Sequence, residues 1–170
     1  MTASEQQLKY RPCVGIMVLN AAGLVWIGRR PDAANEPEGP GAWWQMPQGG
    51  IDEHEDPAKA AMRELAEETG IHSVHMIAES AQWYTYDLPA ELRPRAWGGR
   101  YCGQRQKWFA MRFAGTDEEV VLDRPGHKAE FDAWRWARID ELAGLIVPFK
   151  RAVYTQVVHE FAPLARPVNE

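Results

Sequence analysis

Residues 49–71, with the sequence GGIDEHEDPAKAAMRELAEETGI, constrain the fold of this chain more than any other stretch. Asp56 followed by Pro57 is typical of a helix N-cap with proline at the first helical position. Gly70 is typical of the residue that ends a helix, because glycine adopts the left-handed conformation without strain. The sequence therefore predicts a helix of about three to four turns between these two signals.

Three glutamates lie close together on this predicted helix. At 100° per residue, Glu64, Glu67 and Glu68 fan across roughly 100° of its surface. The residues expected on the opposite, core-facing side are Ala58, Ala61, Met62, Leu65 and Thr69. Carboxylates directed to one place repel one another unless a cation lies between them, and oxygen ligands suit the hard cation Mg²⁺. The alternative is a solvated face of an amphipathic helix, which is the commoner explanation for an isolated Glu-x-x-Glu-Glu pattern.

The bulk composition bounds the class of protein. The 170 residues, 45% of them hydrophobic, are expected to form a single domain over 1–170, with 1–8 loosely attached. The net charge of −5 argues against a protein that coats DNA or RNA nonspecifically. Cys13 and Cys102 are too few for a disulfide framework or a zinc site. No apolar run approaches the ~20 residues of a membrane span, so a soluble cytoplasmic protein without a membrane partner is expected.

Apolar and β-branched runs alternate with breaker-rich loops along the chain. Strands are expected at residues 11–20, 23–30, 43–46, 73–86 (with a break near Glu79), 106–113, 120–122 and 131–137. Helical segments are expected at residues 140–145 and 149–164, and loops at 31–41, 88–99 and 123–130. This mixture predicts an α/β fold in which helices cover a mixed sheet.

The predicted helix and its flanks also match a known signature. At every fixed position the stretch matches the pattern G-x5-E-x7-R-E-U-x-E-E-x-G-U of the Nudix hydrolases, in which U is a bulky aliphatic residue. The matching residues are Gly49, Glu55, Arg63, Glu64, Leu65, Glu67, Glu68, Gly70 and Ile71. A random match in a chain of this length has a probability on the order of one in ten million, from average residue frequencies. The chain thus resembles the Nudix hydrolases, and the resemblance implies their α/β/α sandwich.

The resemblance implies a loop–helix–loop that binds Mg²⁺ or Mn²⁺ and hydrolyses a nucleoside diphosphate linked to another group. Glu64, Glu67 and Glu68 correspond to the metal ligands, and one of them could act as general base. Arg63 and Glu55 correspond to the family's internal pair. A guanidinium beside a carboxylate would hold the glutamates in register and limit their repulsion.

Four further stretches resemble the bacterial RNA pyrophosphohydrolases, a Nudix subfamily that also contains dinucleoside polyphosphate hydrolases. They are residues 10–16, 44–51, 103–109 and 130–136, and Phe149-Lys150-Arg151 adds to the likeness. The chain departs from the subfamily in a longer, Pro- and Gly-rich loop at 31–41 and in Arg105. Both departures lie where substrate could be sensed, so the resemblance leaves the exact substrate open.

The subfamily resemblance adds two residues to the implied metal site. Glu130 corresponds to a glutamate that the subfamily uses as an additional metal ligand, and Gly49 completes the implied set. The turn-rich loop before Glu130 could bring its carboxylate onto the metal. The alternative is an exposed loop glutamate.

Basic and aromatic side chains are candidates for substrate contacts, because phosphate oxygens accept hydrogen bonds from cations and bases stack on rings. The basic candidates are Arg11, Arg29, Arg30, Lys107, Lys150 and Arg151. Among them Arg11, Lys107 and Lys150 are favoured, because the subfamily has them in its substrate cleft. Gln48 could offer an amide to substrate or merely cap the turn. Phe149 could stack on a base or anchor the last helix.

The resulting hypothesis is a Mg²⁺-dependent hydrolase in which water attacks a phosphoanhydride without a covalent enzyme intermediate. The expected substrate is the 5′-end of triphosphorylated RNA, which would lose pyrophosphate or successive phosphates to leave a 5′-monophosphate and so favour RNA decay. The alternative substrate is diadenosine tetra- or pentaphosphate, a dinucleoside polyphosphate cleaved to ATP and a smaller nucleotide. A non-catalytic nucleotide sensor is disfavoured, because the signature lacks none of its glutamates.

Overall fold

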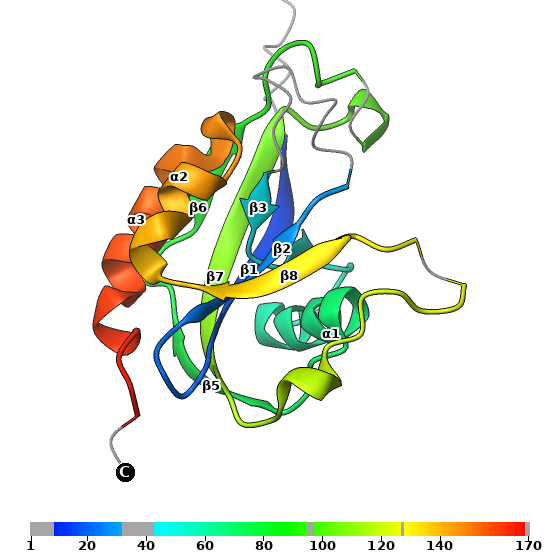
Figure 1. Ribbon diagram of the computed structural model, residues 1–170. Coiled ribbons are helices and arrows are strands. Elements are labelled where there is room, and N and C mark those ends of the chain that lie inside the picture. Colours follow the sequence, from blue (N-terminus) through cyan, green and yellow to red (C-terminus); the bar gives the residue numbers. More distant parts are fainter. Residues whose placement is uncertain (1–8, 32–42, 95–96, 127, 169–170) are drawn as a thin grey trace, which may run out of the picture.

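The computed structural model describes residues 9–31, 43–94, 97–126 and 128–168 (Figure 1). A mixed sheet separates helix α1 (Pro57–Thr69) on one face from α2 (Leu142–Leu145) and α3 (Arg151–Phe161) on the other. The predicted α/β/α sandwich is therefore confirmed. The predicted loose segment 1–8 and nearly all of the predicted loop 31–41 lie outside the described residues.

The centre of the sheet is a parallel pair of long strands, β1 (Tyr10–Leu19) and β7 (Gly103–Phe113). On its other edge β1 pairs with two short antiparallel strands, β2 (Val25–Arg29) and β4 (Gln48–Gly50). The free edge of β7 is divided in the same way between β5 (Val74–Glu79) and β6 (Tyr84–Asp87). The strands β3 (Trp44–Gln45) and β8 (Ala133–Ala137) then extend the sheet from β2.

Strand alternation divides the buried residues into two cores. Even-numbered residues of β1, such as Val14 and Ile16, pack with Leu65 of α1. Odd-numbered residues such as Met17 pack with Trp108 of β7 and with α3. Each long strand thus faces a different helix layer with alternate side chains.

Helix α1 has the predicted ends. The Asp56 side chain accepts a hydrogen bond from the backbone N–H of Lys59, and Gly70 adopts φ 79° at the C-terminal end. Its core-facing side differs from the prediction, because Met62 is 38% exposed. The buried residues are Ala60, Ala61, Leu65 and Thr69. Ala61, Leu65 and Thr69 are buried as predicted, and Glu64 and Glu68 line the cavity beside the sheet.

Other predicted elements are largely present with shifted boundaries. The long strand predicted at 73–86 is broken at Ser80, as expected, because its N–H and its hydroxyl both bond to the Trp108 backbone. The strand predicted at 106–113 begins earlier, at Gly103. The strand predicted at 120–122 is wrong. A short 3₁₀ turn (Asp117–Glu119) is closed by a bond from the Val120 N–H to the Asp117 carbonyl, and the Val121 N–H then donates to the Thr69 carbonyl at the end of α1.

A glycine contact at the centre of the sheet yields a stability prediction. A Cβ at Gly15 would lie 2.4 Å from the indole ring of buried Trp108, so Gly15→Ala should destabilise the protein by about 1–3 kcal/mol through overpacking. The matched control is Gly144→Ala, because a Cβ there meets nothing within 4 Å. Urea unfolding measures the free energy of unfolding of both variants. Equal stability of the two variants would contradict this packing.

Candidate active site

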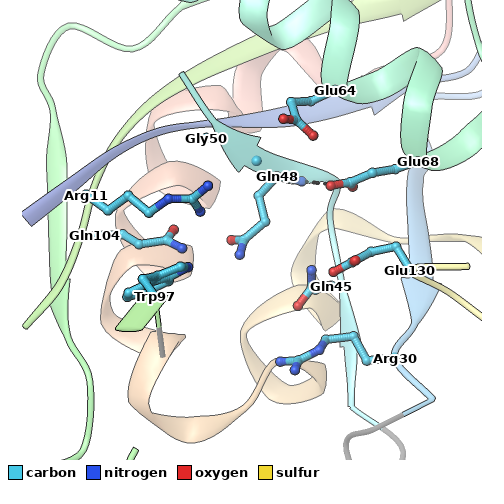
Figure 2. Close-up of a pocket in the computed structure, with 11 residues that line it drawn as sticks. Arg11, Arg30, Gln45, Gln48, Gly50, Glu64, Glu68, Trp97, Gln104 and Glu130 are labelled. Carbon is cyan, nitrogen blue, oxygen red and sulfur yellow. Dashed lines mark hydrogen bonds between the residues drawn. The ribbon is translucent and has the colours of Figure 1, made fainter. Parts of the chain in front are cut away.

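A cavity of about 350 Å³ opens between α1 and the sheet. Figure 2 shows the carboxylates of Glu64, Glu68 and Glu130 on one side of it. Arg11, Trp97 and Gln104 lie on the opposite side, with Gln48 between the two groups. The remaining lining residues are Arg30, Gln45, Gly49 and Gly50. The cavity therefore has an acidic wall and a wall of donors.

Two consecutive glycines of β4 allow both walls to approach its backbone. A Cβ at Gly49 would lie 2.0 Å from the side-chain carboxyl carbon of Glu64. A Cβ at Gly50 would lie 2.3 Å from Nη2 of Arg11. The backbone N–H of Gln48 donates to Glu68 Oε2 at 3.3 Å, which ties β4 to the helix. A side chain at Gly49 or Gly50 would therefore displace the Glu64 carboxylate or the Arg11 guanidinium from its position beside β4.

Arg63 and Glu55 form the predicted internal pair. Its Nε and Nη2 donate to the two carboxylate oxygens of Glu55, both at 2.8 Å, in a bidentate contact. Nη2 also donates to the carbonyl of Gly50, and Nη1 donates to Glu64 Oε1 at 2.9 Å. Through these hydrogen bonds the guanidinium links the loop that carries Glu55 to β4 and to α1. Hydrogen bonds from Arg63 lower the pKa of Glu55 to about 2.

The acidic wall is electrostatically unfavourable by itself. Burial raises the pKa of Glu64, although Arg63 acts in the opposite direction. Burial raises the pKa of Glu68 well above its usual value, and repulsion from Glu130 and Glu64 raises it further. The carboxylates are thus close enough to oppose one another's ionisation.

A second cavity of about 180 Å³ adjoins the same carboxylates and includes the exposed Glu67. Two cations of the segment before Glu130, Arg124 and Lys128, also line it. Arg124 donates to the backbone carbonyls of Ala66 and Glu67 in the last turns of α1. This contact attaches the segment that carries Glu130 to the glutamate helix.

The other end of that segment is fixed on β2. Phe131 is buried against Gly28, where a Cβ would lie 2.5 Å from the ring. Arg29 donates from Nε to Asp132 at 2.8 Å. Arg29 thus helps to fix the chain two residues after Glu130, and it lines neither cavity.

The structure brings most predicted site residues together. The main cavity contains Arg11, Gln48, Gly49, Glu64, Glu68 and Glu130, while Glu67 lines the smaller one and Arg63 with Glu55 lies behind the glutamates. Besides Arg29, four predicted substrate contacts line neither cavity: Lys107, Phe149, Lys150 and Arg151. Lys107 is half-buried on β7, and Lys150 is 6% exposed with its ammonium 5.5 Å from the centre of the Tyr86 ring. Phe149 packs on the core beside Tyr86. Their substrate roles stay predictions.

Sequence reasoning did not single out three of the lining residues, Gln45, Trp97 and Gln104. Trp97 has φ 50°, unusual for a residue with a side chain, and its ring lies under the Arg11 guanidinium at 5.5 Å. Gln104 belongs to a Gln-x-Gln-x-Trp alternation on β7. That alternation was the available signal, because it places polar groups and an indole on one face of a strand.

Comparison with known proteins decides the family. The NUDIX domain model matches residues 9–157. The chain belongs to the Nudix family. An RNA pyrophosphohydrolase from Agrobacterium fabrum is 55% identical to this Nudix chain over 97% of it and 99% of the relative. One from Brucella abortus is 56% identical over 94% of this chain and 92% of the relative.

Solved Nudix-like structures confirm the fold at low identity. A dihydroneopterin triphosphate pyrophosphohydrolase from E. coli superposes with a TM-score of 0.65 at 21% identity, covering 89% of this chain and 98% of its own. A C. elegans Ap4A hydrolase superposes with a TM-score of 0.63 at 16% identity, covering 91% and 96%. At these identities the likeness bears on the fold alone.

Nudix proteins typically depend on a divalent metal, and the acidic wall fits such an ion chemically. Its donors are carboxylate oxygens, which hard divalent cations prefer. Burial raises the pKa of Glu68 most and repulsion from Glu130 and Glu64 adds to the rise, so a cation here would relieve the repulsion. Within the described ranges no three acidic, histidine or cysteine side chains already converge as a set of ligands. Arg63 meanwhile bonds the carboxylates of Glu64 and Glu67.

The Glu55–Arg63 pair predicts a pH dependence of stability. The pKa of Glu55 is lowered in the folded protein, so the unfolded chain binds more protons between its ordinary value of about 4.3 and about 2. The stabilisation is complete above this window and is lost as the pH falls through it. The difference in unfolding free energy between the wild type and Glu55→Gln should therefore shrink from pH 6 to pH 2. A pH-independent difference would contradict the prediction.

The acidic wall predicts opposite effects on stability and activity. The pKa of Glu68 is raised on folding, so its ionised form opposes folding above the ordinary carboxyl pKa. Metal-free Glu68→Gln should accordingly unfold at a higher temperature at pH 7. Its metal-dependent hydrolysis should fall about a hundredfold or more. Glu53→Gln is the control, because the Glu53 side chain is 89% exposed. Calorimetry and rate assays would refute the prediction if Glu68→Gln were less stable or fully active.

Proposed function

We propose that this Nudix protein is an RNA pyrophosphohydrolase. It removes pyrophosphate or successive phosphates from the 5′-end of triphosphorylated RNA and leaves a 5′-monophosphate, an end that favours RNA decay. The observation that carries the proposal is the 55–56% identity, over nearly the whole chain, to proteins named RNA pyrophosphohydrolase. The complete signature and the cavity that collects its glutamates support it.

The two walls of the cavity suit the two parts of this chemistry. We propose that Glu64, Glu67, Glu68 and Glu130, with Gly49 beside them, hold Mg²⁺, for which Mn²⁺ can substitute. Such an ion, when bound, neutralises phosphate oxygens and activates water. Arg63 keeps the glutamates in register through its contacts with Glu55 and Glu64. Arg11 on the opposite wall, and Arg30 on the side of Glu130, donate to the phosphate chain.

We also propose that residues 1–170 act as one domain in the cytoplasm. The matched range 9–157 and the sheet that joins β1 to β8 support one domain. Cys13 and Cys102 are both buried free thiols, as is usual in a reducing compartment. In the part of the chain that is described, no helix has the length and hydropathy needed to cross a bilayer.

The substrate test compares two phosphate chains on the same protein. Turnover of 5′-triphosphorylated RNA should exceed that of diadenosine tetraphosphate and pentaphosphate by more than about tenfold in kcat/KM, or ~1.4 kcal/mol in the barrier. Glu68→Gln serves as the inactive control for contaminating hydrolases. A preference for RNA below about tenfold would undercut the ranking of the two substrates, and a preference for the dinucleoside polyphosphates would overturn it.

A further inference from the structure

A chain of side-chain hydrogen bonds leads from the core to the main cavity. Trp108 Nε1 donates to Gln106 Oε1 at 3.0 Å. Gln106 Nε2 then donates to Gln104 Oε1 at 2.8 Å and to Gln48 Oε1 at 3.1 Å. Trp108, Gln106 and Gln104 alternate along one face of β7, and Gln48 lies on β4. We call these four residues the amide relay.

The polarity of the relay is set at its buried end. An indole N–H can only donate, so the group of Gln106 that faces Trp108 must be its carbonyl oxygen. The Gln106 nitrogen must then face the other two glutamines, which present their oxygens to it. Turning over any one amide would place two donors or two acceptors against each other.

The tryptophan that starts the relay cannot reorient. Trp108 is fully buried, and its ring lies so close to Gly15 that a Cβ there would be 2.4 Å away. Tyr154 packs edge-on against the ring at 5.6 Å, and the Tyr154 hydroxyl accepts a bond from the backbone N–H of Met46. The core thus fixes the direction of the first donor.

The relay leaves two amide nitrogens for the cavity. The oxygens of Gln48 and Gln104 are both engaged by Gln106, while both residues line the cavity. Among the described residues no hydrogen bond is made by Nε2 of either glutamine. Gln104 is 4% exposed, so bulk water is a poor substitute partner for its Nε2, whereas Gln48 is half-buried at the cavity. Two oriented donors therefore face the space between the acidic wall and Arg11 (Figure 2).

We propose that Gln48 and Gln104 form a neutral subsite for the phosphate chain of the substrate, with Gln106 and Trp108 as positioning residues. This deepens the proposed function and rests on it. Phosphate oxygens accept hydrogen bonds, so they match two N–H donors held with fixed polarity. A lysine or arginine at position 48 would instead pair with Glu68, whose carboxylate accepts from the Gln48 backbone. Neutral amides bind phosphate without neutralising the carboxylates that a metal requires.

The test measures binding of inorganic tripolyphosphate to the metal-free, full-length protein by titration calorimetry. Gln104→Met removes one donor and should weaken binding about tenfold. Gln106→Glu can only accept from Trp108, so it should turn both amide oxygens toward the cavity and weaken binding about a hundredfold. Gln106→Met leaves the two amides free to rotate and should give a smaller loss, about threefold to tenfold. Gln82→Glu, at an exposed position outside both cavities, should bind like the wild type.

Two further readouts separate this role from a structural one. Gln104→Met should raise the KM for triphosphorylated RNA about tenfold, while kcat stays within about threefold of the wild-type value. The indole N–H of Trp108 should exchange slowly with solvent in the wild type and faster in Gln106→Met, by nuclear magnetic resonance.

The proposal fails if Gln104→Met binds tripolyphosphate as tightly as Gln82→Glu. It fails equally if Gln106→Glu loses no more affinity than Gln106→Met. Gln104→Met keeps the test valid should either Gln106 variant not fold. Tripolyphosphate contains no nucleoside, so its binding does not depend on whether the protein prefers RNA. A failure of the proposed RNA substrate can therefore be told apart from a failure of the proposed subsite.

Discussion

The parallel pairing of β1 with β7 is the interaction on which the rest of the structure depends. It runs from Tyr10 opposite Gly103 to Leu19 opposite Arg112 and aligns the two longest strands of the described sheet. Each of these strands divides its other edge between two short strands. Because β4 occupies only one end of the β1 edge, helix α1 can bring its glutamates alongside the backbone there. The cavity follows from that division.

The buried glutamates of the site oppose folding, and the guanidinium of Arg63 reduces this destabilisation. Buried carboxylates destabilise a protein unless they are paired or bind a cation. Arg63 contacts Glu55, Glu64 and Glu67 and also bonds to the Gly50 carbonyl. It therefore stabilises the glutamate side of the cavity before any ion is present. Burial disfavours the ionised form of Glu68 most strongly, and within the described residues its carboxylate accepts a hydrogen bond only from the Gln48 backbone.

Local signals predicted what depends on local structure. The ends of α1 followed from Asp56, Pro57 and Gly70, because caps are set by the backbone of a few neighbouring residues. The signature also identified the acidic side of the cavity. By contrast, the exposure of Met62 depends on how the helix rotates when it docks on the sheet, which helical spacing alone does not fix.

Contacts between residues that are distant along the chain could not be predicted from local sequence signals. Arg29 has the features of a phosphate-binding residue in sequence, but in the structure it pairs with Asp132, which is distant along the chain. Gln104 acquires its place in the cavity only because β7 lies between β1 and β6. Residues of this kind become interpretable when strand order and register are known. The family resemblance supplied part of that information, since it carried a known fold with it.

The alternation along β7 has a consequence for how this strand can change during evolution. Trp108 fills the core and Gln104 faces the cavity from the same side of the strand, while Arg105 stacks on Trp83 from the other side. A one-residue insertion or deletion within the strand would exchange the two faces. It would turn the indole out of the core and present Arg105 in place of Gln104. Substitutions along β7 therefore keep its two faces in place, whereas a change in its length disturbs the core and the cavity together.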